Sequence, residues 1–298
     1  MLDQPTPHIA IATCDNLPSW EIDDRPFLDL LASCARVSMC SWNDASVRWS
    51  QFDCVLVRTT WDYSEHVEAF RGWVKRVSSM TRLLNAAGWI DWNCDKRYLL
   101  ELAEQGVHIA PTQWLSLPKA GSLVEAISSA PLVNRWFLKP TIGASSSNTL
   151  RFDLNELDKA QAFLDNLLPA HDFMLQPYLE SVETFGEVSL LYIGGQCTHS
   201  VRKVPVDGDY RVQDDYGAHD EPYTPSAALQ RVGQSILAAA ARVQPRLPPL
   251  LYARLDFLKD LNGRFALNEL ELIEPSLFFR HGPDAPGALV DALLAAMK

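Results

Sequence analysis

Carboxylates are concentrated in the stretch RLDFLKDLNGRFALNELELIEPS, residues 254–276, which otherwise has the pattern of two strands joined by a turn. Asn262-Gly263 between two apolar runs is the strongest short-range signal for a two-residue hairpin loop. That loop pairs Asp256 with Glu269. The same register pairs Arg254 with Glu271. Because side chains alternate between the faces of a strand, the sequence predicts that these four residues share one face.

The opposite face of this predicted hairpin is apolar and is expected to form core. It consists of Leu255, Phe257, Leu270 and Leu272. Like charges directly opposite each other destabilise a sheet, so the acidic face requires a bound cation. A four-residue loop would preserve these faces, whereas a three-residue loop would disrupt them.

Two further stretches combine cations with small residues, as phosphate sites do. In FLKPTIGASSSNTLRF, Lys139 on a strand precedes a small-residue loop that contains Ser145 and Ser146, where backbone N–H groups can approach a phosphate. In RKVPVDGDYRVQ, Lys203 and Arg211 flank a glycine turn and would steady a transferring phosphate. The alternatives are a flexible turn beside a lysine that reaches to solvent, and a solvated charge cluster.

Two other predicted strands end at polar side chains. The predicted strand MLQPYLES runs towards Glu183 and Glu187. The end of such a strand can offer backbone groups to an adenine, and a carboxylate there can accept hydrogen bonds from ribose hydroxyls. The alternative is a sheet edge with solvated glutamates. VRTTWDYSEH leads a strand to Arg58 and Thr59, where an arginine facing a cleft would hold a carboxylate. The alternative for Arg58 is a structural cluster between domains.

The composition is that of a globular protein, with 298 residues of which 47% are hydrophobic and 21% charged. The net charge of −11 argues against nucleic acid or an anionic membrane as the main partner. Six cysteines lie far apart without a C-x-x-C pair, and the N-terminus lacks a positive region followed by an apolar run. We therefore expect reduced thiols, no signal peptide, no membrane partner and a cytoplasmic monomer or homodimer.

The order of predicted elements divides the chain into three parts. Residues 1–92 alternate short strands with helical segments, which is typical of a parallel α/β domain. Residues 93–185 begin with a helix near Asp95 and continue as an α+β unit. Residues 186–298 contain a hairpin at Gly194-Gly195, a long loop at 204–225, a helix near 225–243 and the acidic hairpin.

In their order along the chain, these stretches resemble the ATP-grasp superfamily, whose members include D-alanine–D-alanine ligase and bacterial glutathione synthetase. The resemblance spans nearly the whole chain and implies an α/β N-terminal domain, an α+β lid and an α+β catalytic domain. It implies that Lys96, in NCDKRYLLEL, and Lys139 bind ATP phosphates beside Ser145 and Ser146. The implied adenine and ribose contacts are Gln176, Tyr178, Leu179 and either Glu183 or Glu187.

The resemblance also implies roles for the charged face. Asp256, Glu269 and Glu271 match a signature for Mg²⁺, with Mn²⁺ as an alternative ion, although Glu271 stands where these relatives carry Asn. The implied catalytic cations, which would stabilise charge on the transferring phosphoryl group, are Arg254, Arg211 and Lys203. The hairpin carboxylates would then face one another because magnesium and ATP phosphates lie between them.

The implied activity is ATP-dependent ligation, in which a substrate carboxylate becomes an acyl phosphate that an amine-like nucleophile attacks. The ending ELIEPSLFFRHG, with Ser276 as a substrate contact, resembles the cyclo-ligases that close the ring of D-cycloserine from O-ureido-D-serine. That likeness implies antibiotic biosynthesis on a small amino-acid-like substrate. The alternatives are an intermolecular amino-acid or peptide ligase, an ATP-grasp kinase, and a nucleotide-binding regulatory protein without turnover.

Overall fold

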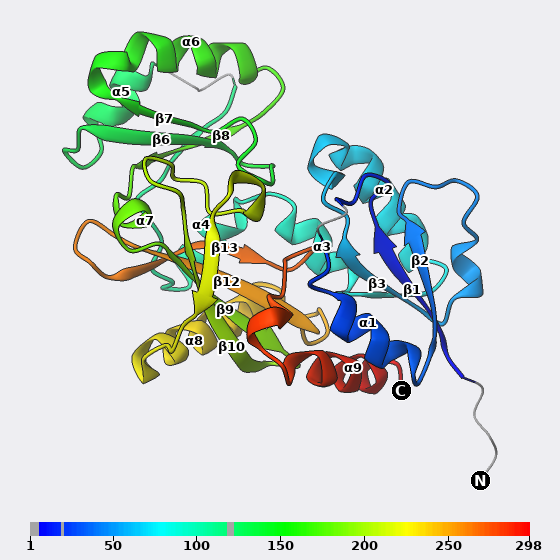
Figure 1. Ribbon diagram of the computed structural model, residues 1–298. Helices are drawn as coiled ribbons and strands as arrows, with labels where there is room; N and C mark the ends of the chain where they lie inside the picture. The colour runs from blue at the N-terminus through cyan, green and yellow to red at the C-terminus, as the bar shows by residue number, and fades with distance from the viewer. Residues whose placement is uncertain (1–5, 19–20, 118–121) are drawn as a thin grey trace.

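The computed structural model describes residues 6–18, 21–117 and 122–298, and its strands form three sheets (Figure 1). The first sheet is parallel, with the strand order β2-β1-β3-β4. Its strands are β1 (His8–Thr13), β2 (Arg36–Ser41), β3 (Cys54–Thr59) and β4 (Arg82–Leu84). Helix α1 (Arg25–Ala32) packs on one face and α2 (Val67–Ser78) on the other. These segments match the alternation predicted from the sequence.

The second sheet is antiparallel and lies at the top of Figure 1, with the order β5-β8-β6-β7. Its strands are β5 (Gln113–Leu115), β6 (Arg135–Pro140), β7 (Leu150–Asp153) and β8 (Phe173–Pro177). Helices α5 (Leu123–Ser128) and α6 (Leu157–Leu167) share an apolar core with this sheet. The opposite face of this sheet contacts other parts of the chain.

The third sheet is antiparallel and central, with the order β11-β10-β9-β12-β13. Its strands are β9 (Glu187–Ile193), β10 (Gln196–Val204), β11 (His219–Pro222), β12 (Tyr252–Lys259) and β13 (Phe265–Glu271). The single long loop predicted at 204–225 is wrong, because β11 lies within it and pairs with β10. The sequence HDEP of β11 lacks the apolar alternation by which strands are recognised.

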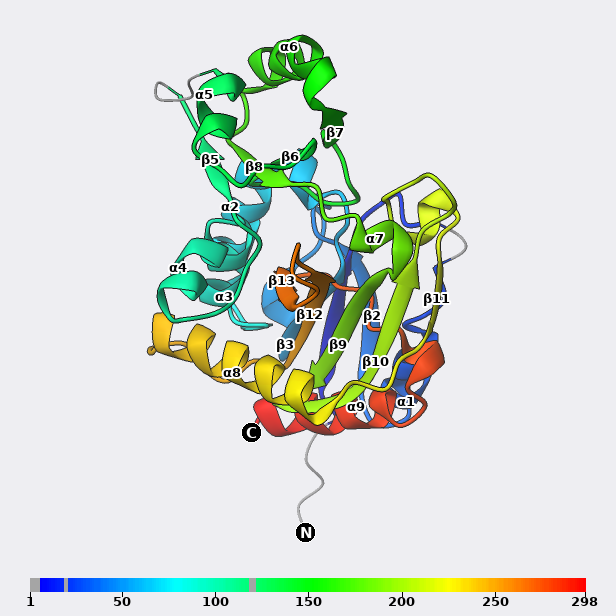
Figure 2. The ribbon, with the colours of Figure 1, turned by 90° about the vertical axis from the view of Figure 1, so that its left-hand side faces the viewer.

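Helices cover both faces of the central sheet. On one face, α3 (Ala87–Asn93), α4 (Tyr98–Glu104) and α8 (Ala227–Val243) form a core with it, and the short α7 (Ser181–Thr184) precedes β9. On the other face, α9 (Ala285–Ala296) joins a core that includes α1 of the first sheet. Figure 2 shows α8 and α9 along the lower side of the molecule. The carboxy-terminal helix therefore packs the last part of the chain against the first. The domain boundaries predicted near residues 92 and 185 stay predictions.

The acidic hairpin, β12–β13, has a different turn from the one predicted. The amide of Asp260 donates to the carbonyl of Arg264 at 2.7 Å and that of Gly263 to Asp260 at 2.9 Å, which leaves three loop residues, 261–263. Gly263 has φ +75°, a conformation that suits glycine. The predicted two-residue loop is therefore wrong.

A β-bulge after the turn restores the predicted register. The strand pairing shifts between Asp256 and Phe257, and the extra residue on the partner strand is Asn268. Asp256 therefore still pairs with Glu269. Arg254 likewise still pairs with Glu271. The predicted core face, made by Leu255, Phe257, Leu270 and Leu272, is fully buried.

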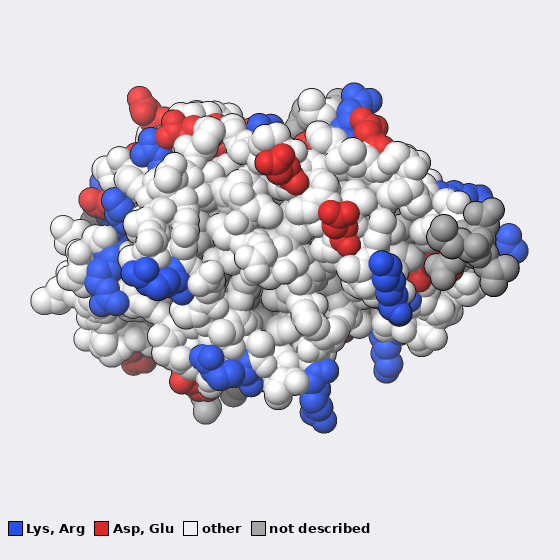
Figure 3. Space-filling model, turned by 90° about the horizontal axis from the view of Figure 1, so that it is seen from below, with Lys and Arg blue, Asp and Glu red and all other residues white. Residues whose placement is uncertain are grey.

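The lower face of the molecule is largely uncharged. Figure 3 shows it mostly white, with Lys and Arg as well as Asp and Glu side chains scattered in separate places, although the chain as a whole carries a net charge of −11. Across the described residues, none of the helices combines the length and apolar character needed to span a membrane.

Candidate active site

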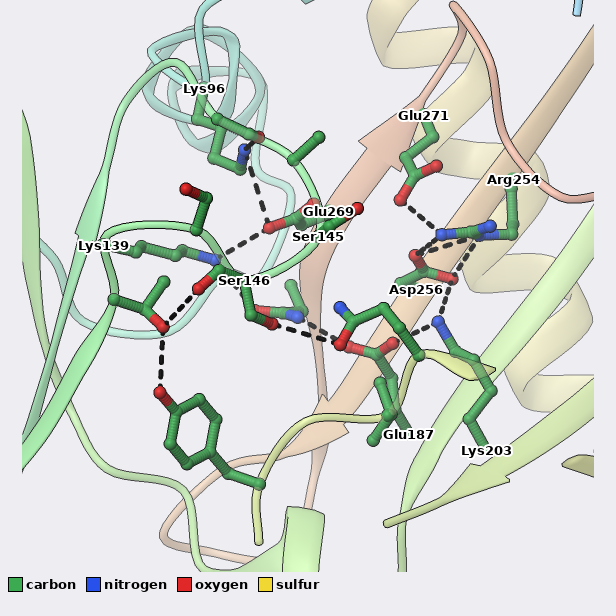
Figure 4. Close-up of a pocket in the computed structure, with 18 of the residues that line it drawn as sticks. Lys96, Lys139, Ser145, Ser146, Glu187, Lys203, Arg254, Asp256, Glu269 and Glu271 are labelled. Atoms are coloured by element: carbon green, nitrogen blue, oxygen red, sulfur yellow. Dashed lines mark hydrogen bonds and ion pairs between the residues drawn. The ribbon is translucent and has the colours of Figure 1, made fainter. Parts of the chain in front are cut away.

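A pocket lies among the three sheets and is lined by residues from each part of the chain. Trp61 follows β3, Lys139 lies on β6 and Asp256 lies on β12. Figure 4 shows Lys96 and Lys139 on one side of Glu269, with Arg254, Lys203 and Asp256 farther along the pocket. Most of the residues that the sequence predicts for the site are therefore brought together.

Lys96 and Lys139 approach the pocket from different elements and meet at Glu269. Lys96, just before α4, donates from Nζ to the carbonyl of Gly143 at 2.6 Å and lies 3.9 Å from Oε1 of Glu269. Nζ of Lys139 lies 3.2 Å from the same oxygen. Burial raises the pKa of Glu269, but the two lysines outweigh burial and hold this pKa below its ordinary value. Two ammonium groups this close suit a polyanionic ligand such as a phosphate chain.

The small-residue loop, residues 142–149, forms one wall of the pocket and touches a second loop, residues 206–217. Oγ of Ser146 donates to Oε1 of Gln213 at 3.1 Å, and the hydroxyl of Tyr216 donates to the carbonyl of Ser145 at 3.1 Å. Ser145 and Ser146 have φ values of +50° and +55°, which non-glycine residues adopt rarely and at a cost. The predicted serines therefore lie on the pocket, in a loop held by polar contacts.

Arg254 lies between two of the predicted metal ligands. Its Nη2 is 3.0 Å from Oδ2 of Asp256 and also donates to Glu271, while Nη1 donates to the carbonyl of Ser276 at 3.2 Å. Burial and the neighbouring carboxylates raise the pKa of Glu271 to about 8, against the effect of Arg254. The guanidinium thus offsets the charge of the two carboxylates on either side of it.

Lys203 is a second buried cation, on β10. It forms an ion pair with Glu187 and lies 3.5 Å from Oδ1 of Asp256. Burial alone would raise the pKa of Asp256, but Arg254 and Lys203 hold it at about 2. Burial raises the pKa of Glu187 above its ordinary value even though Lys203 opposes the shift. Asp256 is therefore a carboxylate under all ordinary conditions.

The three predicted metal ligands share one face of β12–β13 but are separated by cations. Across the residues that the structure describes, no three acidic, His or Cys side chains are grouped so as to hold a metal by themselves. Their hard oxygen donors fit magnesium, which takes few protein carboxylates and completes its shell with phosphates and water. Asp256, Glu269 and Glu271 thus remain the proposed ligands of an ion that would arrive with the nucleotide.

Asn268, the bulge residue, is not among the predicted site residues. Its Oδ1 accepts from Nζ of Lys139 at 3.2 Å, and its Nδ2 donates to Oε2 of Glu187 at 2.6 Å. Strict alternation would turn the side chain of residue 268 to the face opposite that of Glu269, but the bulge lets both side chains face the pocket.

Glu21, Trp61, Glu274 and Phe278 also line the pocket without having been predicted. Only the density of acids in residues 269–274 could have indicated Glu274.

The predicted adenine hinge, Gln176 to Leu179, lies on the pocket at the end of β8. Nε2 of Gln176 donates to Oγ1 of Thr112 at 2.8 Å. The hydroxyl of Tyr178 donates to Glu183, which also pairs with Arg151 at 2.7 Å. Glu187 lines the pocket, whereas Glu183 is not one of its lining residues, which favours Glu187 as the ribose contact.

Arg211 lies beside the pocket rather than on it. Its Nη2 lies 2.7 Å from Oδ2 of Asp209, and its guanidinium stacks 3.9 Å from the ring centre of Tyr216. A catalytic role for Arg211 stays a prediction that requires the 206–217 loop to move.

Arg58 and Thr59 are buried away from the pocket, whereas Ser276 lines it. Nε and Nη2 of Arg58 each donate to Asp24 at 2.8 Å, and Nη2 also donates to the carbonyl of Pro275 at 3.0 Å. Oγ1 of Thr59 donates to Thr13 at 2.8 Å. The guanidinium of Arg58 is 1% exposed and already neutralised, so the geometry fits the structural cluster that was the alternative to carboxylate binding.

The sequence and the fold both match known proteins. A family model described as the N-terminal domain of D-cycloserine synthetase DcsG matches residues 9–85. The chain is 30% identical over 282 residues to cycloserine biosynthesis protein DcsG of Streptomyces lavendulae, covering 90% of this chain and 93% of that protein. The chain belongs to the DcsG family. The crystal structure of D-cycloserine synthetase DcsG matches with a TM-score of 0.88 and 28% identity, over 98% of this chain and 100% of that one.

Other solved structures share the fold of the DcsG family. The ATP-grasp ligase PsnB, complexed with a minimal precursor, matches with a TM-score of 0.66 and 18% identity, over 99% of this chain and 100% of that one. D-alanine–D-alanine ligase from Bacillus anthracis matches with a TM-score of 0.68 and 16% identity, over 98% and 97% of the two chains. The predicted ATP-grasp fold is confirmed. The chain is an enzyme, an ATP-dependent ligase that forms carbon–nitrogen bonds.

Proposed function

We propose that this DcsG-family ligase activates the carboxylate of O-ureido-D-serine and closes the ring of D-cycloserine. The likeness to DcsG across nearly the whole chain carries the proposal. In the proposed reaction, the carboxylate takes the terminal phosphoryl group of ATP, and the substrate nitrogen bonded to oxygen attacks the acyl carbon. Phosphate leaves from that carbon, and water removes the carbamoyl group as carbamate.

The distribution of charge in the pocket supports ring closure over the joining of two amino acids. Among the described lining residues, the cations are Lys96, Lys139, Lys203 and Arg254. In the proposal Lys96, Lys139 and Arg254 serve the phosphates, and Lys203 is paired with Glu187, so none of the four is left for a second carboxylate. A second amino acid would bring a free carboxylate that needs a cation of its own, whereas ring closure consumes the one carboxylate present. Glu21 and Glu274 also line the pocket, and an acidic side chain there would suit the substrate ammonium.

The residues of the chain supply binding and charge stabilisation rather than a nucleophile. In this proposal Lys96 and Lys139 hold the phosphate chain and Arg254 meets charge on the transferring group, and their positions around the carboxylates of the pocket support these roles. Asp256, Glu269 and Glu271 would hold Mg²⁺, or Mn²⁺ as the alternative ion, which would neutralise phosphate charge when bound. The loops 142–149 and 206–217 would shield the acyl phosphate from water.

The test is turnover of O-ureido-D-serine with magnesium and ATP, measured as phosphate release together with product mass. We expect phosphate and D-cycloserine to appear in equal amounts. Phosphate that stays on the substrate would instead identify a kinase. Phosphate release only when two amino acids are present, with a product of their joined mass, would identify an intermolecular ligase. Either outcome would overturn the proposal.

A further inference from the structure

Arg280 lies outside the pocket, on the segment after β13, yet its guanidinium contacts three acids from different parts of the chain. Nη1 lies 3.2 Å from Oδ1 of Asp23, which precedes α1. Nη2 lies 3.0 Å from Oδ2 of Asp214, in the 206–217 loop. Nε donates at 3.0 Å to Oδ1 of Asp220 on β11, and Nη2 also pairs with Asp220. One side chain thus joins three segments.

The segment of Asp23 and the segment that carries Arg280 meet at the pocket near Ser276. The carboxylate of Asp23 accepts from the amides of Phe279 at 3.1 Å and Arg280 at 3.2 Å. It also accepts from Oγ of Ser276 at 3.3 Å. Ser276 and Glu21 both line the pocket, so Asp23 joins its N-terminal wall to the segment that carries Arg280.

The 206–217 loop, through Asp214, connects Arg280 to the small-residue loop. Asp214 lies next to Gln213, which accepts from Ser146, and two residues before Tyr216, which donates to the carbonyl of Ser145. The contacts therefore run without a break from the first domain through Arg280 to the loop beside Lys139. The side chains of Asp23 and Asp220 are 4% and 8% exposed, so solvent screens these ion pairs less than surface pairs.

We propose that Arg280 is a positioning residue that holds the 206–217 loop against the N-terminal wall and so keeps water from the acyl phosphate. This inference rests on the proposed ligase reaction. When the loop opens, water adds to the acyl carbon and the bond from that carbon to the phosphate oxygen breaks. The substrate carboxylate, phosphate and a proton are released, so ATP is consumed without product.

A matched control for Arg280 is found on β10, the strand that pairs with β11. Arg202 on β10 pairs with Glu221 of β11, beside Asp220, and its side chain is 32% exposed compared with 36% for Arg280. Arg202 is not a lining residue of the pocket. Arg280→Met and Arg202→Met therefore remove the same charge from side chains of similar exposure, and only the first breaks the link to the pocket walls.

The first measurement is amide hydrogen exchange of the free enzyme, which needs no substrate. We expect residues 206–217 to exchange about tenfold faster in Arg280→Met, because local opening loses its ion pairs, and to be unchanged in Arg202→Met. Equal exchange in Arg280→Met and the wild type would overturn the proposal. Asp214→Asn, which leaves the contact to Asp23 in place, serves as a second variant if Arg280→Met does not fold.

The second measurement is the ratio of phosphate released to D-cycloserine formed. We expect a ratio near one for the wild type and Arg202→Met, several-fold higher for Arg280→Met, and partly restored in Arg280→Lys. A lowered melting temperature with an unchanged ratio would make Arg280 a structural residue only and overturn the proposal. A wild type that does not turn over this substrate would refute the proposed function, and the exchange measurement would still decide the role of Arg280.

Discussion

Asn268 joins a lysine and a glutamate that approach the pocket from different sheets. Its amide accepts from Lys139 of β6 and donates to Glu187 of β9, at 3.2 and 2.6 Å. An aspartate there would lose the donor to Glu187, and an alanine would lose both contacts. Asparagine therefore lets a cation and an anion be held side by side without adding charge.

We expect Asn268→Ala to weaken ATP binding. Hydrogen bonds to charged groups contribute about 1.5–3 kcal/mol, so the KM for ATP should rise about tenfold or more. Steady-state kinetics with a confirmed substrate checks this, and Asn262→Ala, on the exposed turn of the same hairpin, is the matched control. An unchanged KM in Asn268→Ala would show that Lys139 does not depend on this amide for its position.

The role of Arg58 could not be predicted from its residue type and position alone. An arginine at the end of a strand is a reasonable carboxylate-binding residue, and its type and position are visible in the sequence. Its partner Asp24 is remote in sequence and follows no motif, and the two meet because α1, which begins just after Asp24, packs against the sheet whose strand β3 carries Arg58. Pairing of this kind is a property of the tertiary structure.

At the level of elements, the acidic hairpin was predictable in its faces but not in its turn. The dipeptide Asn262-Gly263 marks the place of a turn, whereas the number of loop residues depends on Asp260. The carboxylate of Asp260 accepts from the amides of Asn262 at 2.8 Å and Arg264 at 2.9 Å, which favours the three-residue loop. The bulge at Asn268 then corrects the register, because the packed face must stay apolar.

We expect Asp260→Asn to destabilise the protein in a pH-dependent manner. Burial raises the pKa of Asp260, but the amide of Arg264 and the ring of His108, 2.8 Å away, outweigh burial and lower it. A lowered folded-state pKa adds stability above the unfolded value of about 3.9, and this stability is lost as the pH falls through the folded value.

The loss at pH 7 should be about 1–2 kcal/mol, which lowers the melting temperature by a few degrees. Thermal unfolding from pH 7 down to pH 3 checks this, with Asp291→Asn on the exposed face of α9 as the control. A difference in melting temperature that stays constant over this range would show that the charge of Asp260 is not what stabilises the turn.

At the level of the whole molecule, acids outnumber cations in the pocket. Among the described lining residues the acids are Glu21, Glu187, Asp214, Asp215, Asp256, Glu269, Glu271 and Glu274, against the four cations named above. The lower surface, in contrast, is mostly uncharged, with acids and cations scattered over it in separate places (Figure 3). Part of the negative charge of the chain is thus gathered where an anionic nucleotide is proposed to bind, which is favourable only if a metal ion accompanies the nucleotide.

The two loops that meet over the pocket should become more protected when nucleotide binds. Residues 142–149 are held to the 206–217 loop by polar contacts, one exposed and one partly buried, so their local opening should be easy in the free enzyme. In the other loop, Tyr210 and Val212 pack against Tyr178 and Val182, which gives it apolar anchors of its own.

Hydrogen exchange with and without magnesium and a non-hydrolysable ATP analogue checks this prediction. We expect protection to increase in both loops. The increase should be larger in 142–149 than in 206–217, because the first loop has less apolar packing in the free enzyme and is therefore less protected before the ligand binds. Helix α8, on the far side of the central sheet, is the internal reference. Equal exchange of residues 142–149 in the free and bound enzyme would mean that this loop does not close over the phosphates.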